Sequence, residues 1–321
     1  MRSLIVILCT LAGAMHAYET VTVTPRADAT GPRVLCIVAH PDDEISFAGT
    51  LYKITTHLDG LVDIALITNG EGGFKYSTLA ESIYGLELTD EAVGRRELPH
   101  IRRTEMIEGC RIMQVHRLFM FYQQDHRYTR DPNEVLAEDA GVWDLDLLRA
   151  SFAEMVADYD VILTHLPILQ THGHHQAATI LALEAVAALP ADQRPVILGE
   201  GRNLEDFTER DGWPITRLAE QAEAHVFDRT QPLGYKDRLN YQIVVNWVIT
   251  AHKSQGTMQL AVSATGREHY WRYACNTPEA EAQVQALFAR LAEPQFPART
   301  YDESAGLDYS ARPPAEAAVT E

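Results

Sequence analysis

The chain has 321 residues, 46% hydrophobic and 22% charged, which is enough for one large α/β domain or two small ones. Its formal net charge of −18 argues against a nucleic-acid partner, because no basic run is present to neutralise phosphates. We interpret the acidic balance as a contribution to solubility.

The first residues have the pattern of an export signal. Arg2 supplies a positive charge, residues 4–11 are apolar, and Ala12-Gly13-Ala14 resembles a small-residue cleavage site. The apolar stretch is too short to span a bilayer. We therefore expect residues 1–17 to be a signal peptide and the mature protein to be periplasmic or secreted from a bacterium, with no integral membrane segment. A buried N-terminal strand is the alternative interpretation.

Residues 34–44 are the most informative stretch. The apolar run 34–38 predicts a strand buried on both faces. Polar side chains follow directly, namely His40, Asp42, Asp43 and Glu44. Open α/β sheets place their sites at the carboxyl ends of strands, and clustered carboxylates repel one another unless a cation shares the space. The first hypothesis is a metal site; the alternative is a helix N-terminus, which suits the acidic residues but gives His40 no role.

Strands and helices then alternate along the chain. We expect strands at 62–68, 118–122, 161–164 and 196–198, and helices at 90–115 (interrupted near Pro99), 143–159 and 176–189. Residues 74–88 indicate a long loop or lid. The segment 235–255 fits a helix by its i+4 apolar spacing and a strand by its β-branched run. The alternation predicts an α/β fold, a Rossmann-like three-layer sandwich with a mostly parallel central sheet.

The expected domain covers residues 18–300, with no internal repeat and no linker. Residues 301–321, rich in Ala, Glu and Pro, indicate a disordered tail. After signal removal three cysteines remain, Cys36, Cys110 and Cys275, which are too few for a disulfide framework. We expect Cys36, inside the first strand, to be a buried apolar residue.

A second polar cluster follows the strand at 161–164. His172 and His175 lie at the start of the next helix, three residues apart, so both imidazoles can reach one site. A polar loop with incidental histidines is the alternative. Because both clusters follow buried strands, we expect them at the same edge of the sheet. Mixed His and Asp ligands with an open position are typical of catalytic zinc, and the absence of cysteine argues against a closed structural zinc site.

At this point the motifs resemble a known family. Ala39-His40-Pro41-Asp42-Asp43-Glu44 is similar to the AHPDDE signature of the LmbE-like, or PIG-L, zinc-dependent N-deacetylases, and residues 172–175 resemble that family's HPDH motif. Looser matches are Thr68-Asn69-Gly70-Glu71 to a TxGE loop, Arg102 and Glu105 to RxxE, and residues 252–255 to HxSQ. Together they cover most of residues 33–255. The chain departs from the second motif at Gly173 and His174. Both metal-facing histidines of the motif are kept, so the departure affects the groups next to the ligands and not metal binding itself.

The resemblance implies an LmbE-like fold and specific roles. His40, Asp43 and His175 would bind one divalent cation per chain, Zn²⁺. Asp42 would be the general base, and His172 would assist as an acid or stabilise the oxyanion. The implied reaction is removal of the acetyl group from an N-acetylated amino sugar, free, in an oligosaccharide or in a conjugate. Further candidates for contact with substrate are Arg102, Asp125 and Asn69.

Two alternatives stay open. One is hydrolysis of another amide or an ester, since a fold does not decide the bond that is cleaved. The other is a non-catalytic periplasmic protein that binds metal or sugar. Asp42 distinguishes these interpretations, because a pure binding protein has no need of a carboxylate beside its ligands. The sequence leaves the oligomeric state open.

Overall fold

A computed structural model describes residues 18–26, 28–202, 207–220, 223–234, 237–262, 264 and 266–294. The expected signal peptide (1–17) and the expected tail (301–321) lie outside these residues. Within the described part of the chain, no helix is long and apolar enough to cross a membrane.

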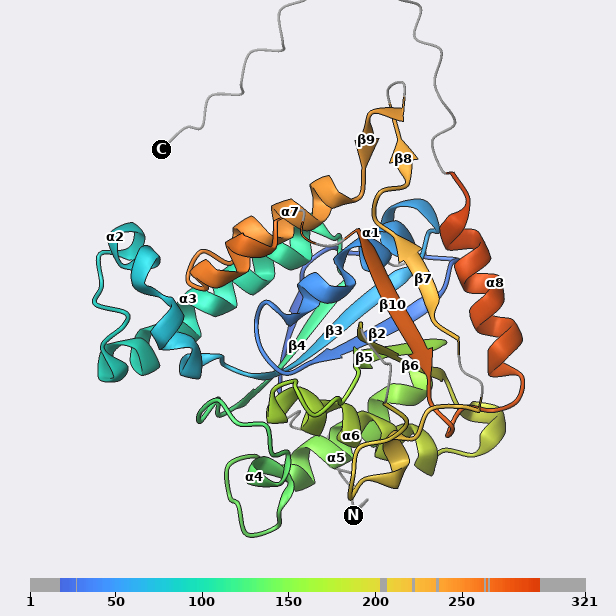
Figure 1. Cartoon of the computed structure of the whole chain (residues 1–321), viewed down its shortest axis with the longest axis horizontal. Coiled ribbons are helices and arrows are strands. Elements are labelled where there is room, and N and C mark those ends of the chain that lie inside the picture. Colours follow the sequence, from blue (N-terminus) through green and yellow to red (C-terminus); the bar gives the residue numbers. More distant parts are fainter. Residues whose placement is uncertain are drawn as a thin grey trace, which may run out of the picture.

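The described residues form one large sheet with the strand order β1-β4-β3-β2-β5-β6-β10-β7 (Figure 1). The strands are β1 (Glu19–Thr22), β2 (Arg33–Val38), β3 (Leu61–Thr68), β4 (Arg117–Gln123), β5 (Val161–His165), β6 (Val196–Glu200), β7 (His225–Asp228) and β10 (Arg267–Arg272). From β4 to β6 all neighbours are parallel, whereas β1, β10 and β7 pair antiparallel. The expected mostly parallel α/β sheet is confirmed. A small hairpin joins β8 (Pro232–Leu233) to β9 (Leu239–Asn240).

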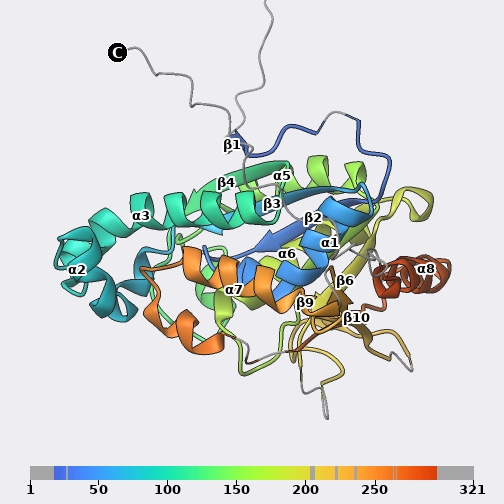
Figure 2. The same ribbon diagram turned by 90° about the horizontal axis from the view of Figure 1, so that it is seen from above.

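Helices cover both faces of the sheet (Figures 1 and 2). One face carries α1 (Ala48–His57), α3 (Glu91–Ile112), α7 (Gln242–Ala251) and α8 (Ala280–Ala292). The other carries α4 (Asn133–Leu136), α5 (Leu145–Met155) and α6 (Gly173–Ala188). Alternate residues of β2 enter the two hydrophobic cores, with Cys36 in one and Ile37 in the other. Both faces are buried, which explains why this strand is a continuous apolar run.

The strand order places two loops together. From β2 the chain proceeds to β3 and β4 on one side, and later returns to β5 and β6 on the other side of β2. The order therefore reverses between β2 and β5. Loops at such a switch point diverge and leave a crevice at the carboxyl ends of the strands. The two polar clusters of the sequence follow β2 and β5 and meet there.

Several elements differ from the expectation. Helix α3 continues through Pro99, because the buried side chains on both sides of it, Leu98 and Arg102, dock the helix despite the lost hydrogen bond. Residues 74–88 form short helical turns, not an open loop, around a small core that includes Phe74 and Leu88. The helical alternative is correct for residues 242–251. The expected elements do not include β1, β7, β10 or α8. The three strands are only partly buried, whereas α8 has buried apolar residues at helical spacing, such as Val284, Leu287 and Leu291.

Candidate metal centre and catalytic site

Three side chains converge at the switch point. Nδ1 of His40 lies 3.1 Å from Nε2 of His175, and that Nε2 lies 3.0 Å from Oδ1 of Asp43. The third pair, Nδ1 of His40 and Oδ2 of Asp43, is separated by 3.6 Å. Tetrahedral zinc ligands at 2.0–2.1 Å from the ion lie about 3.3 Å from one another. The donor atoms of His40, Asp43 and His175 therefore fit a single small cation.

The protonation of this cluster also suits a cation. Oδ2 of Asp43 accepts the backbone N–H groups of Ala39 and His40 at 2.9 and 2.8 Å. Burial opposes ionisation of Asp43, but the neighbouring His175 and His40 hold its pKa well below the usual value. His175 has Nδ1 at 2.9 Å from the hydroxyl of Thr171, so its Nε2 can keep a lone pair for the cluster. His165 stacks on His175 at 4.8 Å between ring centroids and helps to fix that ring.

Asp42 lies next to Asp43 and lines the same cavity as the three side chains, but it is bound by other groups. Its backbone has φ 109° and its N–H donates to Oε2 of Glu44 at 3.0 Å. Its carboxylate accepts a hydrogen bond from Nη2 of Arg102 at 3.0 Å. Burial raises the pKa of Asp42 to about 6, against the opposing charge of Arg102. A carboxyl with that pKa is suited to accept and return a proton near neutral pH.

Arg102 holds the loops around the site together. Its guanidinium is buried and donates to the carbonyl oxygens of Pro41 and Gly70 as well as to Asp42. Gly70 has φ 71°, and a Cβ there would lie 2.5 Å from Nη1 of Arg102. Glycine is therefore required for both the conformation and the close approach. Arg102 lies at the site as predicted, but its contacts are with Asp42 and the two loops.

Residues of two of the looser sequence motifs, RxxE and HxSQ, contact one another and the loop that carries Asp42. Oε1 of Glu44 lies 2.5 Å from Nε2 of His252, and both side chains are fully buried. Glu105 accepts hydrogen bonds from the backbone N–H and hydroxyl of Ser254 at 2.8 and 2.6 Å. These contacts join the loop after β2, helix α3 and the segment after α7. They fasten the loop that carries Asp42, whose φ of 109° is unusual for a residue other than glycine.

His172 faces the cluster from the N-terminus of α6. Its Nδ1 accepts the backbone N–H of His174 at 3.0 Å, so a neutral ring carries its proton on Nε2. Burial, together with the neighbouring charge of His40, lowers the pKa of His172 to about 2. The low pKa keeps the ring neutral, so its Nε2–H can donate a hydrogen bond. The ring lies next to the cluster, with its centroid 4.8 Å from that of His40.

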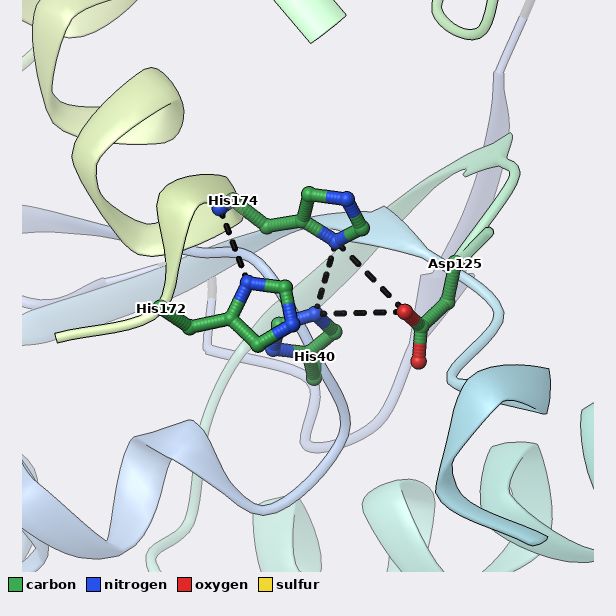
Figure 3. A group of neighbouring side chains, drawn as sticks. All are labelled: His40, Asp125, His172 and His174. Carbon is green, nitrogen blue, oxygen red and sulfur yellow. Dashed lines mark hydrogen bonds and ion pairs between the residues drawn. The ribbon is translucent and has the colours of Figure 1, made fainter. Parts of the chain in front are cut away.

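His40 also belongs to a second group of neighbouring side chains, which contains Asp125, His172 and His174 (Figure 3). Nε2 of His40 is 3.0 Å from Nδ1 of His174, which is fully buried. Oδ1 of Asp125 is 3.8 Å from His40 and 3.5 Å from His174. Its other oxygen accepts the N–H of Gly72 at 3.1 Å. Asp125 thus lies near the site as predicted, close to His40 and fastened to the Gly72 loop.

A cavity of about 400 Å³ opens over the cluster. Seven of the eight predicted site residues line it, namely His40, Asp42, Asp43, Arg102, Asp125, His172 and His175. The eighth, Asn69, is not among the lining residues of the described structure, and its amide donates to the carbonyl of Tyr122 at 3.3 Å. The structure therefore does not bring Asn69 to the site. Tyr76, Tyr128 and Met258 complete the apolar part of the wall.

Comparison with known proteins agrees with the motif assignment. Residues 35–186 match the family model PIG-L, described as GlcNAc-PI de-N-acetylase. The matched residues include both histidine motifs, so this part of the chain is similar to the PIG-L, or LmbE-like, family. A relative is the probable N-acetyl-alpha-D-glucosaminyl L-malate deacetylase 2 of Bacillus cereus. It is 26% identical over 219 residues, which cover 64% of this chain and 90% of that protein.

Solved structures give partial overlaps. N,N'-diacetylchitobiose deacetylase from Pyrococcus horikoshii is 23% identical with a TM-score of 0.35, and the match covers 49% of this chain. This chain spans 50% of the length of that protein. The deacetylase of the A40926 pseudoaglycone is 20% identical with a TM-score of 0.41, covering 76% of this chain and 97% of that one.

Several groups around this site were not predicted from the sequence. His126 and Glu134 continue the histidine contacts behind His40, and His165 packs on a predicted ligand. A usable signal exists for two of them, since His126 directly follows Asp125 and His165 ends β5 at the same sheet edge. Glu134 is in α4, and nothing in its local pattern indicates that it reaches a histidine of the site.

Proposed function

We propose that this protein is a zinc-dependent N-deacetylase that removes the acetyl group from an N-acetylated amino sugar or its conjugate. One observation carries the proposal: the carboxylate of Asp42 stands beside the three-ligand cluster but is bound to Arg102. A protein that only stores or binds a metal has no use for such a group. The PIG-L family model and the deacetylase relatives support the acetyl sugar as substrate.

His40, Asp43 and His175 would hold the ion, as their mutual distances and the ionised Asp43 allow. A zinc ion held there would make water a stronger nucleophile and would polarise the acetyl carbonyl. The cluster contains three protein donors, which is the number typical of catalytic rather than structural zinc.

Asp42 and His172 then have separate tasks. Asp42 takes a proton from the attacking water, and its pKa of about 6 lets it return that proton to the departing sugar nitrogen. His172 donates a hydrogen bond from Nε2 to the carbonyl oxygen as negative charge develops there. The low pKa of His172 favours this donor role over that of the proton source.

Substrate contacts and location remain part of the proposal. Arg102 and Asp125 border the cavity and are proposed to meet the sugar at its edge, while their main bonds hold Asp42 and the Gly72 loop. We also propose export to the periplasm or beyond by a signal peptide in residues 1–17.

A screen for free-amine release tests this function. Substrates would be N-acetylglucosamine, N,N'-diacetylchitobiose, N-acetylglucosaminyl malate and p-nitrophenyl acetate as an ester, each with native, chelator-stripped and zinc-restored protein. We expect amine release from at least one acetylated sugar, loss with the chelator and recovery with zinc. Ester cleavage without any amine release would favour the other hydrolase, and zinc binding without either reaction would favour the binding protein.

A further inference from the structure

A line of hydrogen bonds runs from His40 to a carboxylate near the protein surface. Nε2 of His40 is 3.0 Å from Nδ1 of His174, and Nε2 of His174 is 3.0 Å from Nδ1 of His126. Nε2 of His126 is in turn 3.0 Å from Oε2 of Glu134. Figure 3 shows the first contact of this line, where the rings of His40 and His174 meet.

The end of the line fixes the direction of every bond in it. An ionised carboxylate only accepts, so a neutral His126 donates to Glu134 from Nε2 and keeps a lone pair on Nδ1. His174 then donates to His126 and accepts from His40. The result is that His40 carries its proton on Nε2 and presents the lone pair of Nδ1 to His175 and Asp43. This is the tautomer that a metal ligand requires.

Charge and burial support the same arrangement. Hydrogen bonds from His126 and Arg127 lower the pKa of Glu134 to about 2, so it stays ionised at neutral pH. His174 is fully buried, and its two ring nitrogens each lie 3.0 Å from a partner in the line, Nδ1 from His40 and Nε2 from His126. Asp125, at 3.8 Å from Nε2 of His40, is too far to accept the proton that His174 accepts at 3.0 Å.

We propose that Glu134, acting through His126 and His174, is a positioning residue that fixes the tautomer of His40 and strengthens its Nδ1 as a metal ligand. This inference rests on the proposed function only in taking His40 as a ligand. Metal-binding histidines commonly donate their second N–H to a carboxylate, which orients the ring and raises its basicity. Here the carboxylate acts at a distance, through two neutral imidazoles.

Two substitutions change the line of hydrogen bonds without changing a proposed ligand. Glu134→Gln keeps an oxygen that can accept from His126 but removes the charge, and His126→Ala interrupts the line. Glu138→Gln is the matched control, because it removes an exposed carboxylate four residues further along the chain. The readout is the zinc dissociation constant, measured by competition with a chromogenic chelator, so no substrate is needed.

We expect both Glu134→Gln and His126→Ala to weaken zinc binding on the order of 10-fold, and Glu138→Gln to leave it unchanged. A second comparison uses His174→Asp, which places a carboxylate where it can accept directly from His40. In that background Glu134→Gln should have no effect, because the charge it removes is no longer connected to His40.

Three results would overturn the inference. Zinc affinity of Glu134→Gln and His126→Ala within about two-fold of the control would show that the line does not act on the metal. An undiminished effect of Glu134→Gln in the His174→Asp background would show that its effect does not pass through His174. Two zinc ions per chain, one of them lost in His174→Asp, would mean that His40 and His174 share an ion instead of a proton.

His175→Ala separates this inference from the proposed function. Suppose that His175→Ala abolishes zinc binding, whereas Glu134→Gln leaves the zinc affinity unchanged. The metal site is then correct and the positioning role of Glu134 is wrong. If His175→Ala keeps full zinc affinity, the ligand assignment itself is wrong.

Discussion

Asp42→Asn is the substitution that best separates catalysis from metal binding. Asparagine has nearly the same size, keeps an oxygen that can accept from Nη2 of Arg102, and tolerates a positive φ better than most residues. Alanine would instead leave a buried guanidinium without one of its acceptors. The amide cannot accept a proton from water, so the proposed catalytic task is removed, while the contact with Arg102 loses its charge but keeps a hydrogen bond.

The expected loss follows from that task. Removing a positioned general base costs about 10²–10⁴ in rate, which corresponds to about 2.7–5.4 kcal/mol of transition-state stabilisation. Zinc content should remain near that of the wild type, because His40, Asp43 and His175 are unchanged. Asp43→Asn should behave differently and lose zinc together with activity, because it removes the negative charge among the three donors.

Plasma mass spectrometry gives the zinc content of both variants, and amine release gives kcat/KM on the best substrate of the screen. The reasoning is refuted if Asp42→Asn keeps both its zinc and the wild-type kcat/KM. It is equally refuted if Asp42→Asn loses zinc and regains the full rate once zinc is restored, since Asp42 would then be a ligand.

Three further outcomes are expected. Gly70→Ala should destabilise the fold by about 1–2 kcal/mol, because its Cβ would collide with Arg102 at a positive φ, and an unchanged urea midpoint would contradict this. Burial raises the pKa of Glu200 from 4.5 to about 8 in the folded state. The carboxyl therefore binds its proton more tightly in the folded than in the unfolded protein. As a result, the stability of the fold decreases as the pH rises from about 4.5 to about 8. Glu200→Gln should therefore raise Tm relative to wild type near pH 8 but not near pH 4, and an equal shift at both pH values would argue against that pKa. Mass spectrometry of exported protein should find the chain starting near Met15 or Tyr18; an intact Met1 would argue against export.

The meeting of the three proposed ligands could be predicted because their position depends on local pattern and one topological rule. His40 and Asp43 follow a strand that is apolar throughout, and His175 opens the helix after another such strand. Parallel strands of this kind end at one edge of a sheet, so both clusters meet whatever the details of packing.

The supporting groups could not be predicted in the same way. Glu134 reaches His126 because the loop after β4 folds back on itself, and Arg102 reaches Asp42 because α3 lies across two loops. Such contacts depend on tertiary packing that no local periodicity encodes. The same holds for β7 and β10, which are only partly buried; within the described residues, β10 pairs with β6 and β7 pairs with β10.

X-ray diffraction at the zinc absorption edge, from crystals of protein supplied with one equivalent of zinc, tests the central claim most directly. The account predicts one anomalous peak per chain, at about 2.0–2.2 Å from Nδ1 of His40, Nε2 of His175 and a carboxylate oxygen of Asp43. The carboxylate of Asp42 should lie outside bonding distance of that peak. A peak bound by Asp42, or no peak among these three residues, would contradict the account.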